Sequence, residues 1–169
     1  MNILPEIQHR FTPHSFLPDP LAEGALDRIL EAGRLAPSAK NRQPWRFIVI
    51  EKTEIRERIG KAAYQDERIM QAPVIIAACS ANKGYIMPNG QEAYPIDISI
   101  ASSFMVLQAR HEGLECAFLT TFEEAEMKRI LTVPYGMRVV MLLLIGYSGK
   151  NKSVVNRLDL SRIVSFNHW

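Results

Sequence analysis

The segment from Pro95 to Glu112 constrains the fold of this chain most, because its apolar side chains surround the helical axis instead of forming one stripe. These side chains are Ile98, Ile100, Ala101, Phe104, Met105, Val106 and Leu107. A helix that is apolar on every side is stable only when other elements, or another chain, cover it. Gly113 then ends the segment. We therefore expect a long helix buried in the core or against a partner subunit.

Short β-rich runs and amphipathic stretches alternate around this segment. Their patterns predict strands at 47–50, 74–79, 116–119 and 138–145. Apolar residues at helical spacing predict helices at 21–35, 53–63 and 123–131. Asp19 and Pro20 are expected to start the first helix, and Thr53 to cap the second. Because a helix precedes the first strand and a polar arm follows the last, we expect an α+β fold with a mixed central β-sheet flanked by helices.

Length and composition indicate one globular domain spanning residues 1–169. Apolar residues make up 47% of the 169 positions and charged residues 22%, which is the balance of a folded domain of ordinary size. The longest apolar run, Val139–Ile145, is far shorter than the roughly 20 residues of a membrane-spanning helix. The N-terminal residues show no signal-peptide pattern. We therefore expect a cytoplasmic protein.

Several classes of function are disfavoured by the charge and by missing motifs. The net charge is +2, so no overall field favours nucleic acid or an anionic membrane. Cys79 and Cys116 lie in apolar runs, which indicates buried thiols rather than a disulfide framework. The four histidines lack the helical spacing of a zinc site. Neither G-x-G-x-x-G nor a Gly-Lys-Ser/Thr phosphate loop occurs.

The stretch 36–49, which reads APSAKNRQPWRFIV, is the best candidate for chemistry. It joins a predicted helix to a predicted strand and holds hydroxyl, amide and cationic groups between Pro37 and Pro44. Such a stiff polar frame suits a planar polar ligand. In the other reading, Ser38 and Asn41 only satisfy backbone groups, and Trp45 is a core residue. The residues alone leave both readings open.

The same stretch resembles the hallmark A-P-S-x-x-N-x-Q-P-W-x-F of the FMN-dependent nitroreductases, and it matches every fixed position of that motif. The resemblance extends over nearly the whole chain. It implies the nitroreductase fold, in which a C-terminal arm reaches the partner subunit, and it implies that this loop binds FMN. The residues carried over from the loop are Pro37, Ser38, Ala39, Asn41 and Gln43.

Near the N-terminus the family has a stretch like R-R-S-x-R-x-F that meets the FMN phosphate and the pyrimidine edge of the flavin. The corresponding residues carried over here are Arg10, Phe11, Thr12 and His14. Arg10 keeps a guanidinium group suited to phosphate. His14 stands where the family usually has Lys or Arg beside the flavin N(1) and C(2) carbonyl, and a neutral histidine would stabilise the reduced anion less. The other reading of His14 is a histidine in a surface loop.

The stretch 113–121 resembles the helix end, strand and turn that lie against the flavin ring in the family. The resemblance implies that Leu119, Thr120 and Thr121 contact FMN. Thr120 and Thr121, through backbone N–H groups facing the flavin N(5), are the expected catalytic positions together with His14. Turn residues before a helix at 123 would present free N–H donors in either reading.

The tail from Gly149 is polar and basic but ends in apolar residues. Apolar side chains at the end of a polar tail indicate docking, for example on another chain. The resemblance places Arg157 where relatives reach the FMN phosphate, and a solvated surface arginine is the alternative. Arg10 and Arg157 together would form a minimal clamp for a dianionic phosphate.

The resemblance also implies a homodimer with two FMN sites between the subunits. One subunit would supply the Pro37–Asn41 loop, and the other would supply Arg10, Thr12, Thr120 and Arg157. NAD(P)H would reduce the flavin and leave, and an electron-poor acceptor such as a nitroaromatic, a quinone or a flavin would then be reduced at the same face. The alternatives are another flavin reaction on this scaffold, such as dehalogenation or enoyl-type reduction, and a flavin-binding or flavin-free interaction protein.

Overall fold

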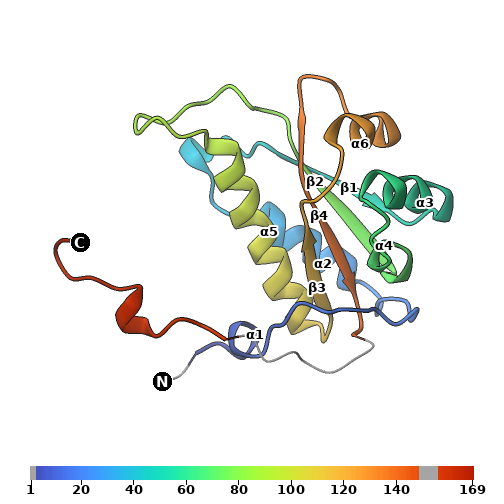
Figure 1. Cartoon of the computed structure of the whole chain (residues 1–169), viewed down its shortest axis with the longest axis horizontal. Coiled ribbons are helices and arrows are strands. Elements are labelled where there is room, and N and C mark those ends of the chain that lie inside the picture. The colour runs from blue at the N-terminus through green and yellow to red at the C-terminus, as the bar shows by residue number, and fades with distance from the viewer. Residues whose placement is uncertain (1–2, 149–155) are drawn as a thin grey trace.

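The computed structural model describes residues 3–148 and 156–169, and its centre is a four-stranded sheet (Figure 1). The strands are β1 (Trp45–Ile50), β2 (Val74–Ser80), β3 (Glu115–Leu119) and β4 (Arg138–Gly146). Their order across the sheet is β1-β2-β4-β3. Each neighbouring pair is antiparallel. β1 and β3 are therefore the two edge strands.

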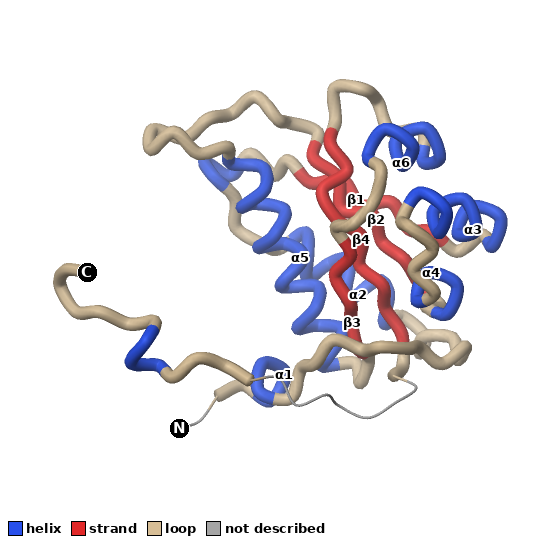
Figure 2. The backbone as a smooth tube through the Cα atoms, in the orientation of Figure 1, coloured by secondary structure: helices blue, strands red, loops and turns tan. Residues whose placement is uncertain are grey.

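Helices cover both faces of the sheet (Figure 2). They are α1 (Pro5–Gln8), α2 (Ala25–Arg34), α3 (Thr53–Ala62), α4 (Arg68–Gln71), α5 (Ala93–His111) and α6 (Glu124–Leu131), with short 3-10 turns η1 (Ala39–Asn41) and η2 (Leu160–Arg162). Alternate side chains of β4 point to opposite faces. Leu143 belongs to the same buried cluster as Met105 of α5, whereas Leu142 belongs to the same buried cluster as Met127 of α6. The core thus has two halves, one under α2 and α5 and one under α3, α4 and α6.

The long helix α5 is buried against the sheet, as its apolar circumference predicts. Ile98, Ala101 and Met105 are fully buried, while Phe104 remains 40% exposed. Gly33 of α2 lets the two helices approach closely, because an added Cβ would lie 2.8 Å from the Met105 side chain. α5 therefore supplies a rigid wall along one face of the sheet.

The predicted α+β class, with a central sheet flanked by helices, is confirmed. The pairing is antiparallel throughout the described residues rather than mixed, because β4 lies between β2 and β3, the two strands that run in the same direction. The predicted start of the first helix is wrong: α2 begins at Ala25, after Gly24 with a φ of 71°. Thr53 begins α3 but is not its cap, because Lys52 holds that position without a side-chain hydrogen bond.

The C-terminal arm, residues 156–169, extends away from the body of the molecule (Figure 1). Every residue in it is exposed, including Phe166 and Trp169. The first part of the predicted tail, 149–155, lies outside the described residues. Both cysteines are free and buried, as expected, and burial raises the pKa of the Cys79 thiol to about 11. Among the described residues, no helix combines the length and the hydropathy needed to cross a bilayer.

Candidate functional site

Three connecting segments leave the same end of the sheet, which is the upper end in Figure 1. Trp45 at the start of β1 pairs with Ser80 at the end of β2, and Ser80 pairs with Arg138 at the start of β4. β3 runs in the direction of β2 and therefore also ends there. The loop before β1, the loop after β2 and the turn after β3 are thus gathered at one end, where candidate site residues can meet a ligand.

The loop before β1 is attached to α5 by a buried carboxyl group. Asp97 is 3% exposed, and its Oδ1 accepts a hydrogen bond from the Ala39 amide at 2.9 Å. Within the loop, Ser38 Oγ accepts a hydrogen bond from the Gln43 amide at 2.9 Å. These two bonds fix both ends of the segment that the sequence motif singles out.

Three residues of this loop have left-handed backbone conformations, namely Lys40 and Asn41 with φ of 53° and Gln43 with φ of 48°. Residues with a Cβ rarely adopt this region, because each costs about 1 to 3 kcal/mol and persists only where its surroundings impose it. Gln43 Nε2 also donates to Asn41 Oδ1 at 3.2 Å, and Trp45 is a buried core residue. The loop is therefore a strained frame whose polar side chains bond to one another, and Pro37 stands exposed at its start.

The turn after β3 borders a cavity of about 390 Å³. Its lining residues are Ala63, Tyr64, Asp66, Arg68, Phe118, Leu119, Thr120 and Thr121. Thr120 and Thr121 are exposed, and within residues 3–148 and 156–169 neither amide has a hydrogen-bond acceptor. The structure thus brings Leu119, Thr120 and Thr121 together at one cavity, with two backbone donors available to a ligand.

The same cavity contains three polar residues that the sequence reading missed. Arg68 forms an ion pair with Asp66, with Nη2 and Oδ2 2.6 Å apart, and this hydrogen bond lowers the pKa of Asp66 against the opposing effect of burial. Tyr64 has a φ of 53°, and its hydroxyl donates to Glu123. The only sequence signal was a short polar stretch, 65–68, between a predicted helix and a predicted strand. The arrangement suits a heteroaromatic ring edge that carries both donors and acceptors.

The N-terminal residues Arg10–His14 cross the other end of β3. They precede Phe16, which forms a β-bridge with Ser148 and whose amide donates to Gln71 Oε1 at 3.2 Å. The positive charge of Arg10 acts on the Cys116 thiol near the start of β3, although burial dominates and raises the pKa of that thiol. Arg10 and Phe11 are partly buried, whereas Thr12 and His14 are exposed.

The structure does not bring all the predicted site residues together in one chain. Three strand spacings, about 14 Å in total, separate edge strand β1, which follows the motif loop, from edge strand β3, which precedes Thr120. Arg157 lies in the exposed arm, where no described residue forms an ion pair with it. The predicted residues therefore form four separate groups, which are the motif loop, the turn after β3, the N-terminal stretch near the start of β3, and the arm.

The fold of this chain recurs in known proteins. A protein of the nitroreductase family from Clostridium difficile has the same fold, with a TM-score of 0.89 and 29% identity over 100% of both chains. The NADPH:FMN oxidoreductase from Vibrio harveyi, solved with NAD+, superposes with a TM-score of 0.88 at 18% identity, covering 97% of this chain and 76% of that one. An NADH dehydrogenase from Thermus thermophilus is 27% identical, with 86% of each chain covered.

The match to a family profile covers most of the chain. The profile described as "Nitroreductase family" matches residues 7–147. This range includes the N-terminal stretch, the motif loop, α5 and the turn after β3, and it stops before the arm. Since the matched range contains the whole sheet and the segments at its upper end, the chain belongs to the nitroreductase family.

Proposed function

We propose that this chain is an FMN-dependent NAD(P)H oxidoreductase that reduces electron-poor acceptors. The observation that carries the proposal is the pair of unpartnered amides at Thr120 and Thr121 beside the cavity at the end of β3. Membership of the nitroreductase family and the names of two similar proteins, an NADH dehydrogenase and an NADPH:FMN oxidoreductase, support the reductant and the cofactor.

The residues around this cavity fit the flavin of FMN. When bound, FMN supplies the group that accepts hydride from NAD(P)H and passes electrons on. The Thr120 and Thr121 amides would donate hydrogen bonds to a ring nitrogen. Phe118, which is exposed, and Leu119, which is largely buried but lines the cavity, would supply apolar surface for the ring. The Asp66–Arg68 pair offers an acceptor and a donor to the polar edge of the ring. These groups bind and orient the ring, and none of them needs to transfer a proton.

The FMN phosphate and the pyrimidine edge are assigned to the N-terminal stretch. Arg10 and Arg157 would hold the phosphate with charged hydrogen bonds, and Thr12 would add a hydroxyl. His14 would face the edge of the ring that gains negative charge on reduction, with Phe11 beside it. From the motif loop, Pro37, Ser38, Ala39, Asn41 and Gln43 would contact the flavin of the partner subunit.

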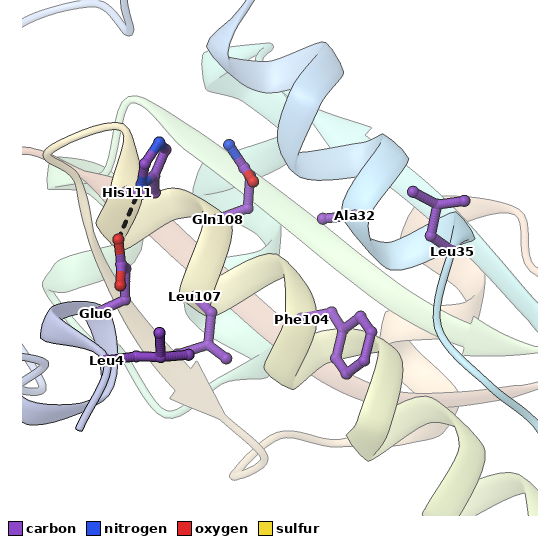
Figure 3. Close-up of a pocket in the computed structure, with 8 residues that line it drawn as sticks. All are labelled: Leu4, Glu6, Ala32, Leu35, Phe104, Leu107, Gln108 and His111. Atoms are coloured by element: carbon purple, nitrogen blue, oxygen red, sulfur yellow. Dashed lines mark hydrogen bonds and ion pairs between the residues drawn. The ribbon is translucent and has the colours of Figure 1, made fainter. Parts of the chain in front are cut away.

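A second copy of the chain is the partner in this proposal. A groove of about 380 Å³ lies between α1, α2 and α5 (Figure 3). Its apolar side chains come from Leu4, Ala32, Leu35, Phe104 and Leu107, and the Glu6–His111 pair, 2.9 Å apart, closes one end. The exposed apolar side chains of the arm, including Phe166 and Trp169, complement this apolar surface. A homodimer would cover both, and light scattering that finds a monomer at micromolar concentration would contradict it.

The reductant and the acceptor would bind in turn at the same open face of the flavin ring. NAD(P)H binds at the Thr120–Thr121 turn, is oxidised and leaves, and the acceptor then occupies the same place. Nitroaromatics, quinones and free flavins have the low-lying acceptor orbitals that this exchange requires. The supply of NAD(P)H favours the cytoplasm as the place of the reaction.

The colour of the purified protein tests the proposal most directly. We expect a yellow protein whose flavin absorbance bleaches under anaerobic conditions when NADPH or NADH is added, and returns when a quinone follows. Double-reciprocal plots at several fixed acceptor concentrations should be parallel, because the reductant leaves before the acceptor binds. A colourless protein that FMN does not reconstitute would refute the assignment and favour an interaction protein with a decayed site.

A further inference from the structure

A second cavity lies at the upper end of the sheet, between α6 and the segment that enters β4. Its volume is about 460 Å³. It is lined by Lys83, Glu124, Ala125, Lys128, Arg129, Val133, Tyr135 and Arg138. Glu124 and Ala125 begin α6, directly after the turn that carries Thr120 and Thr121. One short chain segment, 121–124, therefore connects the linings of the two cavities.

The charges of this second cavity are strongly unbalanced, with four cationic side chains against the single carboxylate of Glu124. Lys128 and Arg138 share that carboxylate at 3.2 and 2.8 Å. Burial has the largest single effect on Glu124 and would raise its pKa, but the hydrogen bonds from Arg138, Lys128 and the Val139 amide, together with the charge of Arg138, lower the pKa overall. Arg129 pairs with Glu126 at 2.5 Å. Within the described chain, Lys83 forms no ion pair, so the cavity carries a surplus of positive charge.

An aromatic ring stands at the rim of this cavity. The Tyr135 side chain is 90% exposed, so it adds nothing to the core. The ammonium groups of Lys83 and Lys128 lie 5.8 and 5.5 Å from its ring centroid, and these cation–π contacts hold cations and ring together. Exposed aromatic rings beside cationic groups bind nucleotides, because the ring stacks on the base while the cations neutralise the phosphate.

We propose that this cavity binds the adenosine half of the reductant and that its cations recognise the 2′-phosphate of NADPH. The proposal rests on the proposed function, since it extends the reductant site from the Thr120–Thr121 turn. Only two residues separate Thr121 from Glu124, so the three-residue step spans at most about 11 Å. One dinucleotide therefore reaches both places, with its nicotinamide at the turn and its adenine on Tyr135. The surplus charge favours NADPH over NADH.

Stopped-flow reduction of the bound flavin under anaerobic conditions tests the site, because it separates the Kd of the reductant from the limiting rate. The test variants are Lys83→Glu and Tyr135→Ala, since both side chains lie at the surface and neither belongs to the core. Lys52→Glu is the matched control, because Lys52 is an exposed lysine that follows β1 at the opposite end of the sheet. Tyr135→Phe keeps the ring and serves as the conservative variant.

For Lys83→Glu, we expect the NADPH Kd to rise by about tenfold, as for the loss of one charged contact to phosphate, with the NADH Kd and the limiting rate unchanged. Tyr135→Ala should raise the Kd of both reductants severalfold, because both carry adenine, while Tyr135→Phe restores wild-type values. Lys52→Glu should leave both constants unchanged. An NADPH Kd that Lys83→Glu leaves unchanged, or shifts equally with that of NADH, overturns the proposal.

Flavin retention tests the proposed function, and nucleotide binding to the second cavity is measured independently of it. A protein that retains no flavin contradicts the function, yet calorimetric titration with adenosine 2′,5′-bisphosphate still tests the cavity. Binding that Lys83→Glu weakens and Lys52→Glu does not would support the site. Equal binding of adenosine 5′-monophosphate and the bisphosphate would remove the 2′-phosphate from it.

Discussion

The hydrogen bond from Ala39 to Asp97 is the contact whose loss should reveal most about the motif loop. Asp97 is 3% exposed on α5, and its Oδ1 lies 2.9 Å from the Ala39 amide nitrogen. Asp97→Ala removes this acceptor and leaves the amide without a partner. Asp97→Asn keeps an oxygen at the same place and removes only the negative charge.

The size of the effect follows from two opposing terms. A hydrogen bond to a carboxylate contributes about 1.5 to 3 kcal/mol. Against it, the left-handed residues Lys40, Asn41 and Gln43 each cost about 1 to 3 kcal/mol in the observed conformation, a cost that contacts such as this bond must offset. Once the bond is lost, the loop should leave its observed conformation, and the apparent FMN affinity falls with the fraction of loops that keep it. We expect the Kd of FMN to rise by about tenfold in Asp97→Ala.

Fluorescence titration of the apoprotein with FMN measures this Kd. Asp97→Asn should weaken binding by only about threefold, because a neutral acceptor retains part of the bond energy. Ser99→Ala is the control, since Ser99 lies on the same helix and its exposed hydroxyl bonds only to the Pro95 carbonyl. An FMN affinity that is equal in the wild type and Asp97→Ala would refute the idea that Asp97 holds the loop for the cofactor.

Further predictions concern charge. Arg10→Ala and Arg157→Ala should each weaken FMN binding by about tenfold, as for one charged contact to phosphate, and equilibrium dialysis that finds the wild-type Kd would remove that arginine from the site. His14→Lys should raise the flavin reduction potential, because a permanent cation stabilises the reduced anion; spectroelectrochemistry that finds an unchanged potential would place His14 away from the ring. A hydrogen bond from Arg28 lowers the pKa of Glu112 from 4.5 to about 2. The stabilisation from this pair is therefore complete above pH 4.5 and disappears as the pH falls towards 2, so urea denaturation of Glu112→Gln should show a weaker pH dependence across that interval than the wild type.

Hydrophobic periodicity predicted the elements of the core because burial alone determines them. β2, β4 and α5 are apolar runs that are stable only when buried, and each is present close to its predicted bounds. The residues at the ends of the helices predicted their bounds less well. Asp19 and Pro20 resemble a helix start, yet the chain turns at Gly24 before α2 begins. The order of the strands could not be predicted from the sequence either, because it depends on which strand lies between β2 and β3.

The site was predicted only where a motif marks it. The motif loop and the Thr120 turn were found by resemblance, whereas Asp66, Arg68 and Asp97 were missed. Asp97 had a signal, since it is the single charged residue between Ala93 and Gln108 in a helix that is otherwise apolar. A carboxyl group at such a place must find a donor, and that donor is a backbone amide distant in sequence. Asp66 and Arg68 had no comparable signal, because their pairing depends on a left-handed turn.

The strand order supports the proposal that two chains share each site. β1 and β3 are opposite edges of the sheet, with β2 and β4 between them, so the motif loop and the Thr120 turn of one chain lie about 14 Å apart. The strain in the loop favours the same conclusion, because strained backbone is retained where a function depends on it. In the proposed dimer, the strained loop would bind the flavin beside the Thr120 turn of a second copy. Mixing Asp97→Ala with a variant defective only in Arg10 should then restore one intact FMN site in each heterodimer, whereas a site built within one chain would show no complementation.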